Sequence, residues 1–326
     1  MTGEEKLSSE LFYVQDLQHS CPTCETKLPD GHVRGRWTKT RNGKNYHIST
    51  HDDFSFHWLV PPTSQPHPHF KEFEDQLASD SSPTTVLHAG CHTLDNQDKN
   101  QIKIKYKIGS PLLNLRLKID KVVSDRDRIF VNNLYENIHD KVYPLPLGIT
   151  RKEIVDFKHL RKNNKEHFCY ANFSITHNYR GNIIRWASGQ ENINCHFTKR
   201  FPDLDEQLDD EFFADDLLPF DEFLSTLASH KFCIVPNGVG IDTDRLWECI
   251  FMNVVPIVQN NYGNRIFSKI WPMILVDMYE FCDMQRLTTE FEERHGKNIQ
   301  YNHDLLLRKN LPELMDRIEH ECKAEA

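Results

Sequence analysis

Short apolar runs alternate with amphipathic helical patterns along most of the chain. Runs that predict buried strands lie at both ends of Lys231–Val258 and at Thr84–Gly90, Arg128–Tyr135, Lys141–Ile149, His167–Ser174, Ile193–Lys199 and Met273–Met278. Helical patterns cover the middle of Lys231–Val258, Arg180–Gly189, Pro219–His230 and the tail after His303. Strands separated by helices of about 10–15 residues are typical of βαβ units on a parallel sheet. The pattern therefore predicts an α/β fold.

The alternation is most regular between residues 165 and 280 and less regular before residue 150. A chain of 326 residues is long enough for two domains, since one domain takes about 100–200 residues. We predict one α/β domain over residues 1–150 and a second over residues 151–326, with the last helix packing back on the first. Two such domains would face each other across a cleft, a common location for ligands.

The stretch KFCIVPNGVGIDTDRLWECIFMNVVPIV, Lys231–Val258, predicts a strand, a loop with two glycines, a helix beginning near Asp242, and a second strand. In doubly wound sheets, ligands bind beyond the carboxyl ends of the strands, which is where this loop lies. Gly238 and Gly240 allow a close approach of the backbone. The helix N-terminus offers free N–H groups to a phosphate. The loop contains neither a Walker A motif nor GxGxxG.

Side chains of this predicted helix divide between two faces. The spacing i, i+1, i+4, i+5, i+8 predicts a buried stripe of Leu246, Trp247, Ile250, Phe251 and Val254. Arg245 and Glu248 lie three residues apart on another face. A cation at the positive end of a helix dipole is unfavourable unless an anion sits in front of it, so Arg245 predicts a bound anion. The alternative is an exposed Arg245–Glu248 ion pair worth roughly a few tenths of a kcal/mol.

Charge and composition narrow the classes of partner. The formal net charge is −9, whereas nucleic-acid-binding proteins are more often basic, so nucleic acid is not an expected partner. The sequence contains no run of about 18 apolar residues, so it predicts no transmembrane segment. The polar, acidic start MTGEEKLSSELFYVQ resembles neither a signal peptide nor a transit peptide. We expect a cytoplasmic protein, or the soluble part of an anchored one.

The nine cysteines are scattered, which is typical of a reducing compartment. Cys21 and Cys24 form a CxxC motif, which is compatible with half of a zinc site or with a redox pair. No second CxxC follows, and the flanking sequence does not predict a thioredoxin-like strand and helix. Two incidental thiols near a turn are therefore the favoured interpretation. We expect neither a bound metal nor a cofactor.

The stretch Lys231–Val258 resembles the donor-binding signature of exostosin-like glycosyltransferases, family 47, and more loosely that of the α1,3-fucosyltransferases. The matching positions are Pro236, Gly238, Arg245, Leu246, Glu248, Ile250, Val255 and Pro256. Asn253 stands where the family has a glycine, and Asp242-Thr243-Asp244 replaces its serine-rich approach. A second, weaker match is CYANFSITHNYRGNIIRW, which resembles the first strand–loop–helix of the same catalytic domain.

The resemblance implies a GT-B fold, in which two Rossmann-like domains face a cleft. Residues 1–150 would hold the acceptor, and residues 151–326 would bind the nucleotide sugar. The implied donor-binding residues are Asn172, Ser174, Arg180, Pro236, Asn237, Gly238, Asp244, Arg245 and Glu248. Basic groups would neutralise the departing diphosphate in place of a metal, and Glu248 would accept hydrogen bonds from ribose hydroxyls. The alternative for Arg180 is that it only starts a helix.

Inverting sugar transfer needs a carboxylate or histidine that deprotonates the acceptor hydroxyl. By resemblance this base comes from the first domain. Asp52 or Asp53 is the first candidate, because both precede an apolar run. His92 or Asp95, which follow the predicted strand at Thr84–Gly90, are the second candidates. Each of these residues has an ordinary alternative as a loop histidine or a turn aspartate.

The resemblance therefore predicts a glycosyltransferase that moves a sugar from a UDP- or GDP-sugar to a hydroxyl of a glycan or glycoprotein. It implies direct displacement with inversion and without a metal. The alternative is a non-catalytic α/β protein that binds a nucleotide or a glycan, such as a degenerate transferase. A kinase or dehydrogenase is disfavoured by the missing Walker A and GxGxxG motifs.

Overall fold

The computed structural model describes residues 128–137, 139–175, 178–199, 208–214, 216–238 and 240–325, without the side chains of Asn178 and Arg308. Before residue 128 it describes only the backbone of short strands: β1 Thr26–Lys27, β2 Val33–Arg34, β3 Ile48–His51, β4 Phe54–Trp58 and β5 Thr84–His88. Four candidate bases, Asp52, Asp53, His92 and Asp95, lie outside the described residues, as do Cys21 and Cys24.

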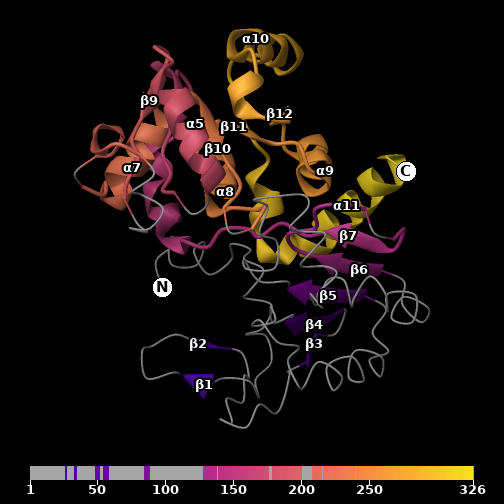
Figure 1. Ribbon diagram of the computed structural model, residues 1–326. Helices are drawn as coiled ribbons and strands as arrows, with labels where there is room; N and C mark the ends of the chain where they lie inside the picture. Colours follow the sequence, from indigo (N-terminus) through magenta and orange to yellow (C-terminus); the bar gives the residue numbers. More distant parts are fainter. Residues whose placement is uncertain are drawn as a thin grey trace.

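Two five-stranded sheets dominate the fold (Figure 1). The first has the order β3-β4-β5-β6-β7, where β6 is Arg128–Val131 and β7 is Val142–Pro144. Its strands are parallel except for β3 at the edge. The second has the order β12-β11-β10-β8-β9 and is parallel throughout. Its strands are β8 His167–Ala171, β9 Ile193–Cys195, β10 His230–Val235, β11 Val255–Gln259 and β12 Ile274–Val276. The predicted α/β class with two Rossmann-like units is confirmed.

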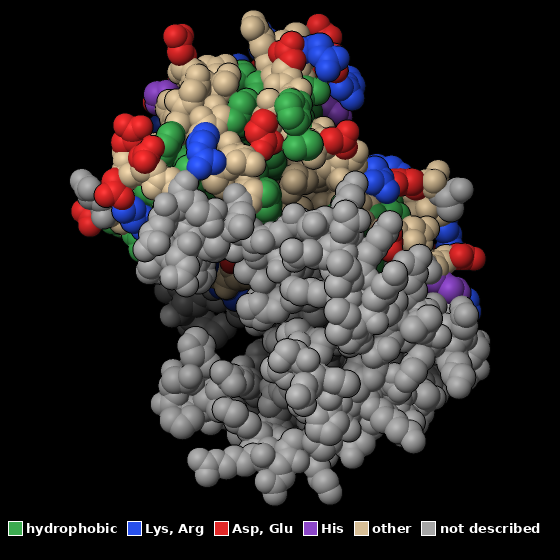
Figure 2. All heavy atoms as spheres, viewed as in Figure 1, with side chains coloured by type: hydrophobic (Ala, Val, Ile, Leu, Met, Phe, Trp, Pro, Cys, Tyr) green, Lys and Arg blue, Asp and Glu red, His purple; other side chains and the backbone are tan. Residues whose placement is uncertain are grey.

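The described α-helices lie between strands of the second sheet, after its last strand and in the C-terminal tail. They are α5 Asn178–Ser188, α7 Phe220–Ala228, α8 Asp244–Phe251, α9 Tyr262–Ile270, α10 Met284–His295 and α11 Leu311–Glu325. The first three and α11 were predicted, whereas α9, α10 and a 3-10 helix at Lys152–Leu160 were not. None of the described helices is both long enough and apolar enough to cross a membrane. On the face drawn in Figure 2, acidic and basic side chains are interspersed over the described part of the surface.

Both faces of the second sheet are buried. Successive residues of a strand point to opposite sides of the sheet, so neighbouring residues of β10 belong to different apolar clusters. Phe232 and Ile234 of β10 belong to the cluster that contains residues of α5 and α10. Cys233 and Val235 belong to the cluster that contains residues of α7 and α8. The second cluster continues through α9 and α11 to β6 and β7, so one apolar core joins the two sheets within the described residues.

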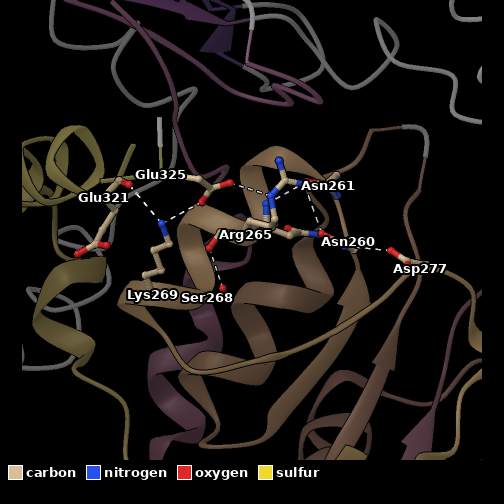
Figure 3. Close-up of polar contacts among 9 residues, drawn as sticks. Asn260, Asn261, Arg265, Ser268, Lys269, Asp277, Glu321 and Glu325 are labelled. Atoms are coloured by element: carbon tan, nitrogen blue, oxygen red, sulfur yellow. Dashed lines mark hydrogen bonds and ion pairs between the residues drawn. The ribbon is translucent and has the colours of Figure 1, made fainter. Parts of the chain in front are cut away.

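The C-terminal helix α11 lies beside β7 and α9 (Figure 1). Its last residue, Glu325, pairs with Arg265 at 2.8 Å and with Lys269 at 2.9 Å, both on α9 (Figure 3). At the other sheet, Arg128 of β6 pairs with Asp316 at 2.5 Å and with Glu319 at 3.3 Å. Through these ion pairs α11 contacts a strand of the first sheet and a helix of the second unit.

Helix α8 ends in a Schellman motif, which explains the unusual Asn253. The N–H of Val254 donates to the carbonyl of Cys249 at 2.9 Å, and the N–H of Asn253 donates to Ile250 at 3.2 Å. This motif requires a left-handed residue, and Asn253 has φ 57°. Asparagine tolerates this conformation better than other residues with a side chain. The family's glycine can therefore be replaced here without breaking the turn.

His303 precedes α11 and lies against the C-terminal end of α8. Its Nε2 is 3.1 Å from the carbonyl of Ile250, and its Nδ1 is 3.3 Å from Nη1 of Arg161. A neutral imidazole can donate to the carbonyl and accept from the guanidinium at once. Burial, aided by the charge of Arg161, lowers the pKa of His303 to about 4.

We expect His303 to make the protein sensitive to acid. The unfolded chain binds a proton near the ordinary histidine pKa of about 6.5, whereas the folded chain binds it only near pH 4. This contribution is therefore complete above pH 6.5 and is lost as the pH falls toward 4. It amounts to up to about 3 kcal/mol. Urea unfolding of the parent and of His303→Gln between pH 4 and 7 measures it, and parallel pH profiles of the two proteins would contradict it.

Candidate functional site

A cavity of about 710 Å³ opens at the carboxyl ends of β8 and β10. These strands are neighbours, but β8 leads into α5 on one face of the sheet and β10 leads into α8 on the other. Such a switch point leaves a crevice where α/β proteins bind ligands. The loops after β8, β9 and β10 and the first turn of α8 line the cavity. Leu147 and Arg151, which follow β7, also line it, as do four residues before and within the first turn of α7: Leu217, Leu218, Phe220 and Phe223.

Arg245, in the first turn of α8, is held from three sides. Its guanidinium carbon lies 3.7 Å from the ring centroid of Phe223 on α7. Nη2 donates to Oδ1 of Asn172 at 3.1 Å, and Nη1 lies 3.2 Å from Oε2 of Glu248. The arginine side chain is 22% exposed. A cation is therefore fixed at the edge of the cavity with part of its surface open.

Glu248 lies one turn farther along α8 and is buried, with 6% exposure. Burial raises the pKa of its carboxyl group, and the charge of Arg245 opposes this shift. The ion pair of the alternative interpretation therefore exists, but it is not an exposed surface pair, because Glu248 is buried. The carboxylate lies in the wall of the cavity, where it can accept hydrogen bonds from hydroxyl groups of a ligand.

Two buried donor groups at the start of α8 have no hydrogen-bond partner among the described residues: Nη1 of Arg245 and the hydroxyl of Thr243. The geometry of Nη1 toward Glu248 is that of an ion pair without an aligned hydrogen bond. Thr243 is the N-cap residue of α8, but its side chain caps no backbone N–H. Uncapped N–H groups at a helix N-terminus attract an anion. The unused donors of Thr243 and Arg245 lie at the same helix end.

Further charged residues stand around the cavity. Arg151 lies over the ring of Phe220, 4.8 Å from its centroid, and Lys199 forms an ion pair with Asp210. The exposed side chain of Asp244 lines the same wall. With Arg245, these groups give the described lining a mixed charge that includes several cations.

Arg180, in the first turn of α5, has 7% exposure. It donates to three backbone carbonyls: Nη1 to Ser174 at 2.8 Å, Nε to Asn237 at 2.8 Å and Nη2 to Pro236 at 2.9 Å. Burial lowers the pKa of its guanidinium. The alternative that Arg180 only starts a helix does not account for these three bonds.

The structure brings the predicted donor residues together. Eight of the nine line the one cavity: Asn172, Ser174, Arg180, Pro236, Gly238, Asp244, Arg245 and Glu248. The ninth, Asn237, is buried and turns its carbonyl toward Arg180. Their roles toward a donor remain predictions.

Asp242 joins the loop before α8 to the first sheet. Its carboxylate accepts hydrogen bonds from the N–H of Leu147 at 2.5 Å and from the indole of Trp247 at 2.7 Å. Its own N–H donates to Oδ1 of Asn133, the residue that follows β6 by two positions, at 2.9 Å. Burial, against these hydrogen bonds, raises the pKa of Asp242 to about 7. The donor-side loop is therefore fastened to the loops after β6 and β7.

Sequence reasoning missed Phe223, Thr243, Arg151 and Lys199. Phe223 belongs to the predicted helix at Pro219–His230, where the periodicity indicates only a core position. Thr243 precedes a helix and is a common N-cap residue, so an N-cap search would have found it. Arg151 and Lys199 follow strands, but no short motif distinguishes them from other surface cations.

Across the described residues, no three histidine, cysteine, aspartate or glutamate side chains gather as metal ligands. The candidate bases lie outside these residues, so the geometry joins none of them to the cavity. Transfer without a metal remains a prediction.

No protein-family model matches the chain, and no curated protein matches its sequence. Solved structures with a similar fold include an α,α-trehalose-phosphate synthase (UDP-forming) from Burkholderia vietnamiensis, with 10% identity and a TM-score of 0.38. That match covers 83% of this chain, which spans only 64% of the synthase. The spinosyn rhamnosyltransferase SpnG is similar with 8% identity and a TM-score of 0.31, covering 78% of this chain and 72% of SpnG. These values assign neither a family nor a substrate.

Proposed function

We propose that the chain is a glycosyltransferase that binds a UDP- or GDP-sugar in this cavity. It transfers the sugar to a hydroxyl of a glycan or glycoprotein. The observation that carries the proposal is Arg245: a guanidinium is fixed at the N-terminus of α8 beside an unused hydroxyl of Thr243, and its own Nη1 lacks a hydrogen-bond partner among the described residues.

A diphosphate matches these groups chemically. The guanidinium fork suits two phosphate oxygens, and the dipole and N–H groups of α8 stabilise the negative charge that grows as the diphosphate leaves. Glu248 supplies a carboxylate for ribose hydroxyls. The resemblance of Lys231–Val258 to the donor signature of exostosin-like enzymes supports the same assignment.

In the proposed reaction the acceptor oxygen attacks the anomeric carbon while the bond from that carbon to the diphosphate oxygen breaks. A carboxylate or histidine of residues 1–150 takes the proton of the acceptor hydroxyl, with Asp52, Asp53, His92 and Asp95 as candidates. The nucleoside diphosphate leaves with the bonding electron pair, and the anomeric centre is inverted. The boundary near residue 150 separates the acceptor side from the donor side.

We expect one nucleotide class to raise the melting temperature. A ligand at 100 times its Kd stabilises the folded chain by about 2.7 kcal/mol, which corresponds to a rise of several degrees. A thermal-shift panel of UDP, GDP and their sugars tests this, with UMP and GMP as controls that lack the second phosphate. No shift with any diphosphate would overturn the proposal. Binding without sugar release or transfer would favour the non-catalytic alternative.

A further inference from the structure

We infer that Arg180 is a positioning residue that fixes the two loops facing the donor diphosphate and does not itself bind the phosphates. This inference deepens the proposed function and rests on it. It reassigns one of the two cations that the family resemblance directs at the diphosphate, and leaves Arg245 as the cation that faces the ligand.

The contacts of Arg180 go to the protein backbone. Each of its three guanidinium nitrogens donates to a carbonyl within 2.9 Å, and the side chain is buried. The acceptors come from two different loops: Ser174 follows β8, whereas Pro236 and Asn237 follow β10. A planar guanidinium can span both loops because its donors point outward as a fork. A lysine in the same place has the charge but not the fork.

The loop after β10 is built around this guanidinium. The carbonyl of Asn237 accepts a second hydrogen bond, from the hydroxyl of Tyr179. The N–H of Gly238 donates to the carbonyl of Gly240 at 2.8 Å. A Cβ atom at position 238 would lie only 3.4 Å from Nη2 of Arg180. The loop therefore packs directly on the arginine, and its path depends on it.

The loop after β8 connects Arg180 to Arg245, the cation that faces the ligand. Arg180 binds the carbonyl of Ser174, and two residues earlier Asn172 accepts a hydrogen bond from Arg245 at 3.1 Å. Asn172 is itself oriented by a hydrogen bond from its Nδ2 to the hydroxyl of Tyr170 at 3.0 Å. Loss of Arg180 therefore loosens the support of Arg245 without removing the charge of Arg245.

Amide hydrogen exchange without ligand tests the positioning role, because a residue that only contacts the ligand leaves the free protein unchanged. We expect Arg180→Lys and Arg180→Gln to speed exchange at least tenfold in residues 171–175 and 235–240, with other described segments unchanged. Both variants should lose at least tenfold in affinity for UDP or GDP, whichever the parent binds. The matched control is the double variant Arg245→Met/Glu248→Gln, which leaves no unpaired carboxylate at position 248. It should lose affinity with unchanged exchange in residues 235–240.

Arg180→Lys separates the two roles, since it keeps the positive charge. Unchanged loop exchange, or affinity rescued by lysine, would overturn the inference, as would fast loops with unchanged affinity. If the Arg180 variants do not fold, Tyr179→Phe replaces them in the experiment. We expect this variant to speed exchange in residues 235–240 alone. Unchanged exchange in these residues would overturn the inference. A parent that binds neither UDP nor GDP would instead refute the proposed function, while the exchange data would still report whether Arg180 holds the loops.

Discussion

Arg245→Met is expected to lower the affinity for UDP or GDP at least about 100-fold. A hydrogen bond to a charged group contributes about 1.5–3 kcal/mol, and a guanidinium fork makes two of them to a diphosphate. Methionine keeps the apolar contact with Phe223, over which the guanidinium lies at 3.7 Å. The loss is therefore one of charge and hydrogen bonding more than of packing. Isothermal titration calorimetry with the nucleotide that the parent binds measures it.

The removal of Arg245 also leaves the buried carboxylate of Glu248 without its ion-pair partner. Its pKa, already raised by burial, then rises further, and the protein loses stability as the pH increases through that value. The double variant Arg245→Met/Glu248→Gln removes this stability effect and isolates the loss of binding. Arg286→Met on α10, an exposed arginine paired with Glu290 at 3.4 Å, is the control for a general change in charge. Equal affinities of Arg245→Met and the parent would contradict the proposed diphosphate site.

Periodicity predicted α8 well because the helix has one strongly apolar side. Leu246, Trp247 and Ile250 are all buried as expected. The burial of Glu248 was not predictable in this way. Its ion-pair partner Arg245 is held by Asn172 in the loop after β8 and by Phe223 on α7, both far away in the sequence. Local spacing shows which side chains share a face but not what packs against that face.

The role of Arg180 shows the same limit. A sequence motif places an arginine after a small polar loop, and a cation near a diphosphate is a reasonable prediction. Its three carbonyl partners depend on the parallel pairing of β8 with β10, strands separated by about 60 residues. Every residue has a backbone carbonyl, so the sequence does not show which carbonyls an arginine contacts. An arginine that binds the protein backbone therefore cannot be distinguished in the sequence from one that binds a ligand.

The failure to predict helix α10 has a different cause. Helix α10 buries only Met284, Thr288 and Phe291 of its twelve residues, so its apolar stripe is too sparse to predict from a pattern. Its two capping residues, however, can be found in the sequence. In the structure Asp283 accepts a hydrogen bond from the N–H of Arg286 at 3.0 Å, and Gly296 follows the last helical residue with φ 84°. An aspartate before and a glycine after a polar segment are start and stop signals for a helix.

Gly240→Ala is expected to destabilise the fold by about 2–4 kcal/mol. A Cβ atom at position 240 would lie 2.6 Å from Oδ1 of Asn133. That oxygen also accepts the hydrogen bond from the N–H of Asp242, so the clash acts on the contact between the donor-side loop and the loop after β6. Urea unfolding measures the cost. Gly181→Ala in α5 is the control, because its Cβ would meet only Leu208 at 4.0 Å and alanine favours a helix by up to about 1 kcal/mol.

A double-mutant cycle identifies the cause of this cost. Asn133 has φ 58°, a conformation that glycine adopts readily, so Asn133→Gly removes the amide without straining the backbone. The single change loses the hydrogen bond from the N–H of Asp242, about 1 kcal/mol, but it opens the space that a methyl group at position 240 needs. In this background Gly240→Ala should cost at least about 1 kcal/mol less than in the parent, since contacting residues couple by about 0.5–3 kcal/mol. Additive costs would show that the glycine is required for another reason than the clash with the Asn133 side chain.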